Sequence, residues 1–195
     1  STSRRQRQMC IRDRYQALQS QLNPHFLFNS LNTLISEIGY NPENAILFTQ
    51  NLSDVYRYIL QCQQQRLVTL GSELEFLDSY VFLHRVRLGD CITVDCRLDE
   101  SLLEYRLPPL TLQLLAENVI KHNIISLRQP MVLSLSSKDE NWLVVSNSVR
   151  PKKSVQPSGM GLKNLASRYR LVCGQEIIIE KTTELFTVKI PLLYE

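Results

Sequence analysis

The most constraining feature of this 195-residue sequence is a strict alternation of three- and four-residue steps between apolar side chains. It connects Ala45, Phe48, Leu52, Val55, Ile59 and Cys62. Such spacing places one narrow apolar stripe along an α-helix. A second repeat precedes it, at Ile11, Tyr15, Leu18, Leu22, His25, Leu31, Leu34 and Ile38. Two helices with such narrow stripes cannot bury both alone, so the pattern predicts a helical hairpin that dimerises into a four-helix bundle.

Pro24 interrupts the earlier repeat directly before His25. A proline inside a helix costs about 3 kcal/mol and removes a backbone hydrogen bond, so a compensating gain is expected. We interpret Pro24 as a kink that loosens the turn before His25 and lets the imidazole leave the apolar seam. Asn29 lies one turn further on the same face and can hydrogen-bond the ring. The alternative is a histidine packed in the core.

The pattern changes at Leu67, where we place a boundary between two domains, residues 1–66 and residues 67–195. The second part is expected to run helix, strand, helix, strand, strand, helix, strand, strand. This order predicts helices packed on a mixed sheet, so the whole chain is expected to be α+β, a helical hairpin followed by a two-layer α/β sandwich. The irregular segment 148–160 is long for a compact domain, which indicates either a functional or a floppy loop.

Positive charge is concentrated at the start of the chain. The first 14 residues carry +4, whereas the remainder carries −1. An arginine-rich start fits the cytoplasmic flank of a membrane span, a solvated helix face or a nucleic-acid arm, and the absence of a matching basic and aromatic surface elsewhere weakens the last reading. No apolar run approaches the ~18 residues of a membrane span, so the sequence as given is expected to be soluble. Its five cysteines, without a C-x-x-C pair, indicate reduced cytosolic thiols.

Three polar residues share one stripe of the helix expected after Pro109. Asn118, Lys121 and His122 occupy positions i, i+3 and i+4. An asparagine oxygen can complete the shell of a Mg²⁺ ion that also holds phosphate, and a lysine can pair with phosphate charge. The alternative is a helix end with polar residues in water.

A glycine pair at the end of the long loop strengthens the phosphate hypothesis. Gly159 and Gly161 lie at the start of a predicted helix, where backbone N–H groups and the helix dipole favour anions. Lys152 and Lys153 in the same loop can fold over an anionic ligand, although loop lysines are usually just solvated. The conjunction of these features with the polar stripe indicates a nucleotide site.

Three segments together resemble a known family. LQSQLNPHFLFNSLN, LPPLTLQLLAENVIKHN and SGMGLKNLASRYRL resemble the phosphoacceptor box, N box and G2 box of LytS-type sensor histidine kinases, whose catalytic domain is a Bergerat-fold (GHKL) ATPase. The resemblance implies that residues 1–66 dimerise and carry the phosphoacceptor, and that residues 67–195 bind ATP. It implies roles for His25 as phosphoacceptor, Asn118 as Mg²⁺ ligand, Lys121 as phosphate contact, and Gly159 and Gly161 as hinges of an ATP lid. The neighbours His122, Leu162 and Asn164 complete the expected ATP-binding set.

Departures from the family pattern bear on the chemistry. ATP-hydrolysing relatives carry a glutamate four residues before the N-box asparagine, where this chain has Leu114, so transfer to histidine is expected over hydrolysis. Phe26 stands where many kinases have an acidic residue after the histidine, so the base is unassigned. Glu117 is a candidate for it, and the alternative is that Glu117 is a surface carboxylate. The aspartate that usually holds the adenine amine is replaced by Asn147, whose amide oxygen can accept the same hydrogen bond.

The resemblance implies a homodimer that phosphorylates His25 and passes the phosphoryl group to an aspartate of a response regulator, which in this family is often of LytTR type. The full-length protein is then expected at the cytoplasmic face of the bacterial inner membrane, anchored through a segment upstream, with no direct nucleic-acid partner. Two rival functions are a pseudokinase scaffold, indicated by the degenerate adenine site, and an ATP hydrolase.

Overall fold

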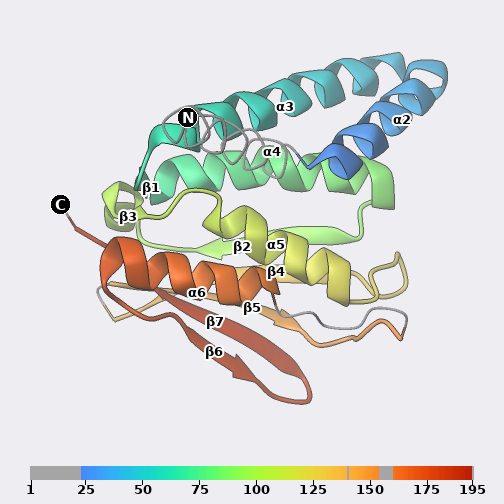
Figure 1. Cartoon of the computed structure of the whole chain (residues 1–195). Coiled ribbons are helices and arrows are strands. Elements are labelled where there is room, and N and C mark those ends of the chain that lie inside the picture. The colour runs from blue at the N-terminus through green and yellow to red at the C-terminus, as the bar shows by residue number, and fades with distance from the viewer. Residues whose placement is uncertain (1–22, 140, 154–159, 195) are drawn as a thin grey trace, which may run out of the picture.

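A computed structural model describes residues 23–139, 141–153 and 160–194 (Figure 1). An antiparallel pair of helices lies over a layer of three further helices, which in turn covers one face of a five-stranded sheet. The α+β arrangement of a helical hairpin followed by a two-layer α/β sandwich is therefore confirmed. The longer elements are α2 (Pro24–Tyr40), α3 (Pro42–Gln61), α4 (Leu70–Leu88), β2 (Ile92–Arg97), α5 (Thr111–His122), β4 (Met131–Lys138), β5 (Trp142–Ser148), α6 (Met160–Cys173), β6 (Ile178–Lys181) and β7 (Leu185–Pro191).

Helix α2 begins at Pro24, so the predicted kink within a continuous helix is wrong for the described residues. Asn23 is the N-cap, with φ of 39°, and its side-chain oxygen accepts a 3.2 Å hydrogen bond from the backbone N–H of Phe26. At the first helical position a proline loses no hydrogen bond, because that N–H has no helical partner in any case. The predicted seam between Ile11 and Leu22 lies outside the described residues.

The apolar stripe of α3 is buried within the chain rather than left for a partner. All six residues of the predicted stripe are buried, and α3 packs on both α2 and α4. Tyr58 stacks on Phe76 of α4 with ring centroids 4.6 Å apart. The expectation that both stripes require a second copy is therefore wrong for α3, because a helix of the second part of the chain supplies the missing surface.

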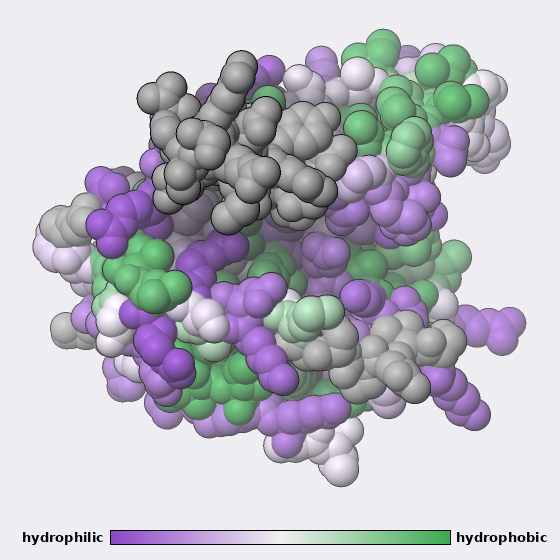
Figure 2. Space-filling model, in the orientation of Figure 1, coloured by the Kyte–Doolittle hydropathy of each residue, from purple (hydrophilic) through white to green (hydrophobic). Residues whose placement is uncertain are grey.

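Helix α2 keeps an exposed apolar face. Its exposed large residues are Phe28, Leu31, Ile35, Ile38 and Tyr40, and the first turn and a half of α3 adds Ile46 and Leu47. Figure 2 shows apolar surface gathered over the end of the hairpin where α2 turns into α3. The unburied apolar surface of the hairpin thus lies mainly on α2 and the α2–α3 turn.

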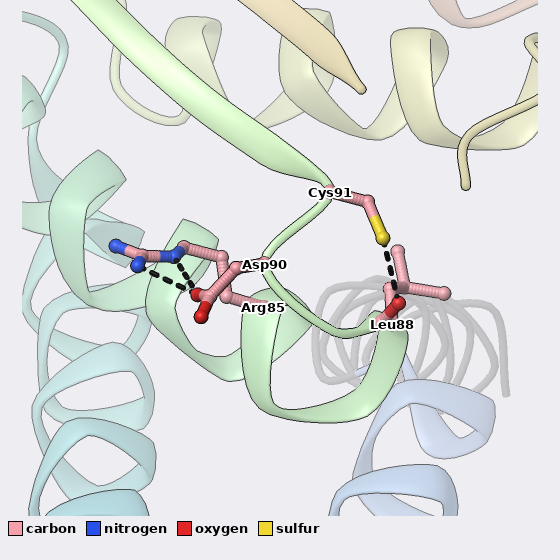
Figure 3. A network of polar contacts seen from close by, with 4 residues as sticks. All are labelled: Arg85, Leu88, Asp90 and Cys91. Atoms are coloured by element: carbon pink, nitrogen blue, oxygen red, sulfur yellow. Dashed lines mark hydrogen bonds and ion pairs between the residues drawn. The ribbon is translucent and has the colours of Figure 1, made fainter. Parts of the chain in front are cut away.

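Helix α4 begins earlier than the capping-box pattern at Ser72 and Glu75 indicates, because Thr69 is its N-cap and accepts a hydrogen bond from the Ser72 N–H. It ends at Gly89, whose φ of 76° is readily adopted only by glycine. Figure 3 shows how the turn into β2 is closed: Arg85 donates two hydrogen bonds to Asp90 Oδ1, and the Cys91 thiol donates to the Leu88 carbonyl.

The sheet has the strand order β2-β4-β5-β7-β6, with β2 and β4 parallel and the other neighbours antiparallel. The expected order of helices and strands is confirmed. The structure adds β1 (Val68–Thr69) and β3 (Arg106–Leu107), which pair with each other, and the 3-10 helices η1 (Cys62–Gln64) and η2 (Glu100–Glu104). Elements this short carry no readable periodicity.

The buried apolar side chains form one cluster that runs from the hairpin to the sheet. It includes Phe26 and Phe48 from the hairpin as well as Leu133 and Val188 from the sheet. The boundary at residue 66 stays a prediction about how the chain divides, while the packing shows that the hairpin rests directly on the helical layer.

Candidate nucleotide and phosphoacceptor site

The polar stripe of α5 lies at the C-terminal end of that helix. Asn118 and His122 are partly buried and Lys121 is exposed, while Leu115, Ala116, Val119 and Ile120 on the other side are buried in the core. The helix ends at His122, with Asn123 as its C-cap. The apolar face fixes the rotation of α5, so the three polar side chains are presented together away from the core.

The segment that follows β5 is fastened to the end of α5. The Arg150 N–H donates to Asn123 Oδ1 at 2.8 Å, and the Ile124 N–H donates to the Arg150 carbonyl at 2.7 Å. Lys152 donates twice, from its backbone N–H to the His122 carbonyl and from Nζ to the Ile120 carbonyl. These bonds bring the end of β5 beside the polar stripe. The described start of the long loop is therefore ordered against α5, whereas residues 154–159 lie outside the described residues.

Positive charge converges around His122. Burial lowers the pKa of this imidazole, and the charges of Lys121, Lys152 and Lys181 lower it further. The ring is thus neutral near pH 7, in a region where three ammonium groups from α5, the loop and β6 act on the same point. Such a cluster favours an anionic ligand.

Asn147 occupies the helix-covered face of β5. Its side chain is 4% exposed and follows Leu143 and Val145 on that face. The Nδ2 group donates a 2.7 Å hydrogen bond to the Ser148 carbonyl, which leaves Oδ1 with acceptor capacity. The chemistry of this buried amide fits the exocyclic amine of adenine.

The first turn of α6 lies against α5. A Cβ atom on Gly161 would stand 3.8 Å from Leu114 Cδ2, at an ordinary contact distance. Leu162 packs on the core and Asn164 is exposed. Gly159 lies outside the described residues. The structure therefore brings the described part of the predicted glycine box close to the face of α5 that carries Leu114.

His25 lies apart from this nucleotide site. The ring is exposed on the first turn of α2, and the Asn29 side-chain nitrogen lies 3.2 Å from its Nδ1 and 3.4 Å from its Nε2. Within the described ranges, no hydrogen bond or ring contact joins His25 to α5.

Phe26 fixes the turn that carries His25. Its ring is 8% exposed and packs against Tyr80 and His84 of α4, with centroids 5.4 and 5.5 Å away, and against Tyr56 of α3 at 6.4 Å. The sequence indicated only that Phe26 replaces an acidic residue. In the structure it is an apolar anchor that leaves the preceding histidine facing outward.

Two further titratable residues have shifted pKa values. Burial raises the pKa of Glu117, while Lys121 acts in the opposite direction. A raised carboxyl pKa suits a proton acceptor, although no described contact links Glu117 to His25. His84 of α4 is packed: it is 5% exposed, its Nδ1 accepts from Arg87, and burial followed by the Arg87 charge lowers its pKa to about 3.

The sequence that forms this candidate site is similar to those of several known proteins. Residues 13–92 match the family described as histidine kinase. The sensor protein LytS of Staphylococcus haemolyticus is 34% identical over 64% of this chain. The sensor histidine kinases YpdA and BtsS of Escherichia coli K12 are 31% and 30% identical over 90% and 92% of it. The chain belongs with the LytS-type sensor histidine kinases.

This LytS-type chain spans 21% of the length of LytS and 33% of the lengths of YpdA and BtsS. In the part of the chain that the structure describes, no helix has the length and hydrophobicity needed to cross a membrane. The resemblance drawn from the three sequence motifs is confirmed, whereas the roles of individual residues stay predictions.

Two residues that make hydrogen bonds at the ends of α5 were not predicted from the sequence. Asn123 ties the loop to α5, and the only sequence signal is its place directly after the polar stripe. Glu73, from α4, lies at the other end of α5 and accepts hydrogen bonds from its first N–H groups. Nothing in the local sequence links Glu73 to a helix that begins 38 residues later.

Proposed function

We propose that this chain is the transmitter region of a two-component sensor kinase, which transfers the γ-phosphoryl group of ATP to His25 and then to an aspartate of a response regulator. The observation that carries the proposal is the cluster at the end of α5. There Asn118, Lys121 and His122 share one stripe of α5, the segment after β5 is bonded to the end of that helix, and Lys152 and Lys181 add positive charge near His122. This is the combination that a nucleotide triphosphate requires.

The described residues fit Mg²⁺ and ATP. Asn118 would offer an amide oxygen to a Mg²⁺ ion that keeps phosphate and water oxygens, and Asn147 would accept from the adenine amine. When bound, Mg²⁺ would neutralise part of the phosphate charge. Lys121 would pair with the phosphates, and the first turn of α6, with Gly161, Leu162 and Asn164, would close over them together with Gly159.

His25 would accept the phosphoryl group. A neutral ring nitrogen attacks the γ-phosphorus, the bond between that phosphorus and the β,γ-bridging oxygen breaks, and ADP leaves. The other ring N–H loses its proton to a base, for which Glu117 is the candidate because burial raises its pKa. Asn29 orients the ring through the contact at 3.2 Å.

Leu114 favours transfer over hydrolysis. Its side chain lies beside Gly161 at the position where hydrolytic relatives place a glutamate. A hydrocarbon there cannot take a proton from water. A histidine that approaches this face therefore meets little competition from water as the nucleophile.

Dimerisation would cover the apolar face of α2. A groove between α2 and α3 is lined by Leu34, Ile38, Pro42, Ala45, Ile46 and Thr49, next to the exposed apolar residues of the hairpin. A second copy packed here would complete a four-helix bundle. We further propose that the chain is attached through an upstream segment to the cytoplasmic face of the bacterial inner membrane and that its regulator is of LytTR type.

The direct test is incubation with γ-labelled ATP and Mg²⁺, with His25→Gln as the comparison. The expected result is label on the wild-type chain that is lost in acid, stable in base and absent from the variant. Label that persists in His25→Gln would overturn the assignment of His25. No label and no measurable Mg-ATP binding would favour the pseudokinase scaffold, and steady phosphate release from unlabelled protein would favour a hydrolase.

A further inference from the structure

Glu73 is a fully buried carboxylate in the layer between the hairpin and the sheet. It projects from the first turn of α4 and is 0% exposed. Burial raises its pKa, and hydrogen bonds from Leu112, Tyr58, Leu110 and Thr111 act in the opposite direction. An ionisable side chain this deeply buried is costly unless its acceptor atoms are satisfied.

The carboxylate is satisfied by donors from two other helices. Oε1 accepts from the Leu110 N–H at 2.7 Å and from the Tyr58 hydroxyl at 2.8 Å, and Oε2 accepts from the Leu112 N–H at 3.0 Å. The backbone of Thr111 contributes a further hydrogen bond. Backbone N–H groups can only donate, so the arrangement suits an ionised carboxylate.

These donors are the first N–H groups of α5, which has no cap of its own. Leu110, the N-cap residue, has a left-handed backbone with φ of 61° and offers no side-chain hydrogen bond. The N–H groups at a helix start have no helical partners, and buried ones need an acceptor from elsewhere. Glu73 supplies that acceptor and also places negative charge at the positive end of the helix dipole.

The same carboxylate links α5 to the hairpin. Tyr58 comes from α3, and its hydroxyl shares Oε1 of Glu73 with the Leu110 N–H. Burial and the neighbouring Glu73 charge raise the pKa of Tyr58 well above its usual range, so the hydroxyl keeps its proton and stays a donor. A displacement of the hairpin therefore acts on the atom that holds the start of α5.

We propose that Glu73 is a positioning residue for the nucleotide site: it fixes the start of α5 and thereby the placement of Asn118 and Lys121 two turns further along. The inference rests on the proposed function, in which those two side chains hold Mg-ATP. The hydrogen bond from Tyr58 places this support in contact with the helix pair that presents His25.

Glu73→Gln is the test, with Glu75→Gln as the matched control, because Glu75 lies two residues later on α4 and is exposed. Hydrogen exchange is measured on a peptide that covers residues 110–122, without nucleotide, and Mg-ATP affinity is measured by titration. The amide carries an NH2 group in place of one carboxylate oxygen. Its N–H donors would therefore face an N–H or O–H donor that Glu73 accepts from in the wild type. Exchange at the start of α5 is expected to rise about tenfold and Mg-ATP to bind about tenfold more weakly, with the control unchanged.

Two outcomes would overturn the proposal: folded Glu73→Gln with wild-type exchange in this peptide, or equal effects of both variants. If Glu73→Gln does not fold, Glu73→Asp keeps the charge on a side chain one methylene shorter. Hydrogen exchange in the same peptide is expected to rise about threefold, and the affinity for Mg-ATP is expected to fall about threefold. Wild-type values would contradict the proposed role of Glu73. A wild-type chain that binds no Mg-ATP would refute the proposed function alone, because the exchange measurement needs no nucleotide.

Discussion

Helices α2 and α5 carry the two halves of the proposed reaction, yet they begin in opposite ways. Helix α2 is capped by Asn23, directly before it, and Pro24 fills its first position. Helix α5 begins at a left-handed leucine without a side-chain cap and depends on Glu73 from another helix. One start is specified by adjacent residues and the other by a residue 37 positions away.

The difference indicates how freely the start of each helix can move. The first turn of α2 is held to the rest of the chain by the ring of Phe26, and apolar contacts have no directional requirement. The start of α5 is held by directional hydrogen bonds to a buried carboxylate, and losing them would leave a buried charge unsatisfied. We therefore expect the turn that carries the proposed phosphoacceptor, His25, to open more readily than the helix that carries the proposed nucleotide residues.

Removal of the Phe26 ring should cause the largest loss of stability, because this ring holds the first turn of α2. Phe26→Ala deletes a side chain that is 8% exposed, so the free energy of unfolding is expected to fall by about 3 kcal/mol. Phe28→Ala in the monomeric chain is the matched control: the same change two residues later, at a side chain that is 65% exposed, should cost less than about 1 kcal/mol when the protein is dilute enough that no second copy covers α2. Urea unfolding of both variants measures the difference, and equal losses would contradict the anchor.

Acid should weaken the same anchor through His84, which packs on Phe26. The pKa of His84 is about 3 in the folded chain, below the ordinary 6.5. The unfolded state therefore binds the proton first, and the stability that neutral His84 contributes is complete above pH 6.5 and lost as the pH falls toward 3. The expected loss is about 1.4 kcal/mol per pH unit in that window.

His84→Gln removes this titration. Its unfolding free energy, measured in urea at intervals between pH 7.5 and 4.5, should fall less steeply than that of the wild type. The other groups that contribute acid sensitivity are common to both proteins, so the difference in slope reports on His84. Identical slopes in the two proteins would show that His84 is not held neutral by its packing against Tyr80, Phe26 and Arg87.

The sequence predicts the elements of the fold and the polar stripe of α5 because both depend on short-range periodicity. Asn118, Lys121 and His122 share a face at fixed spacing, whatever packs around them. The start of α2 was wrongly predicted although its signal was present: Asn23-Pro24 is the same pair of cap and first-turn proline with which α3 begins at Asn41-Pro42. The apolar repeat running through Pro24 outweighed that signal.

The remaining features are set by contacts between distant residues. Nothing near Glu73 shows that its carboxylate will meet the N–H groups of Leu110 and Leu112. Likewise, the stripe of α3 indicates an apolar partner without indicating that α4 of the same chain, rather than a second copy, covers it. Such pairings require the fold itself.

The most direct test of the contrast compares one amide in each helix of the wild-type chain. The Leu27 N–H bonds to the Asn23 carbonyl and the Leu114 N–H to the Leu110 carbonyl, both at 3.2 Å, so the two first-turn hydrogen bonds have the same length. Hydrogen exchange followed by NMR should show Leu27 exchanging at least about tenfold faster than Leu114, because only α5 is held by directional bonds to a buried carboxylate. Equal rates, or faster exchange at Leu114, would contradict the assignment of a releasable phosphoacceptor turn and a fixed nucleotide helix.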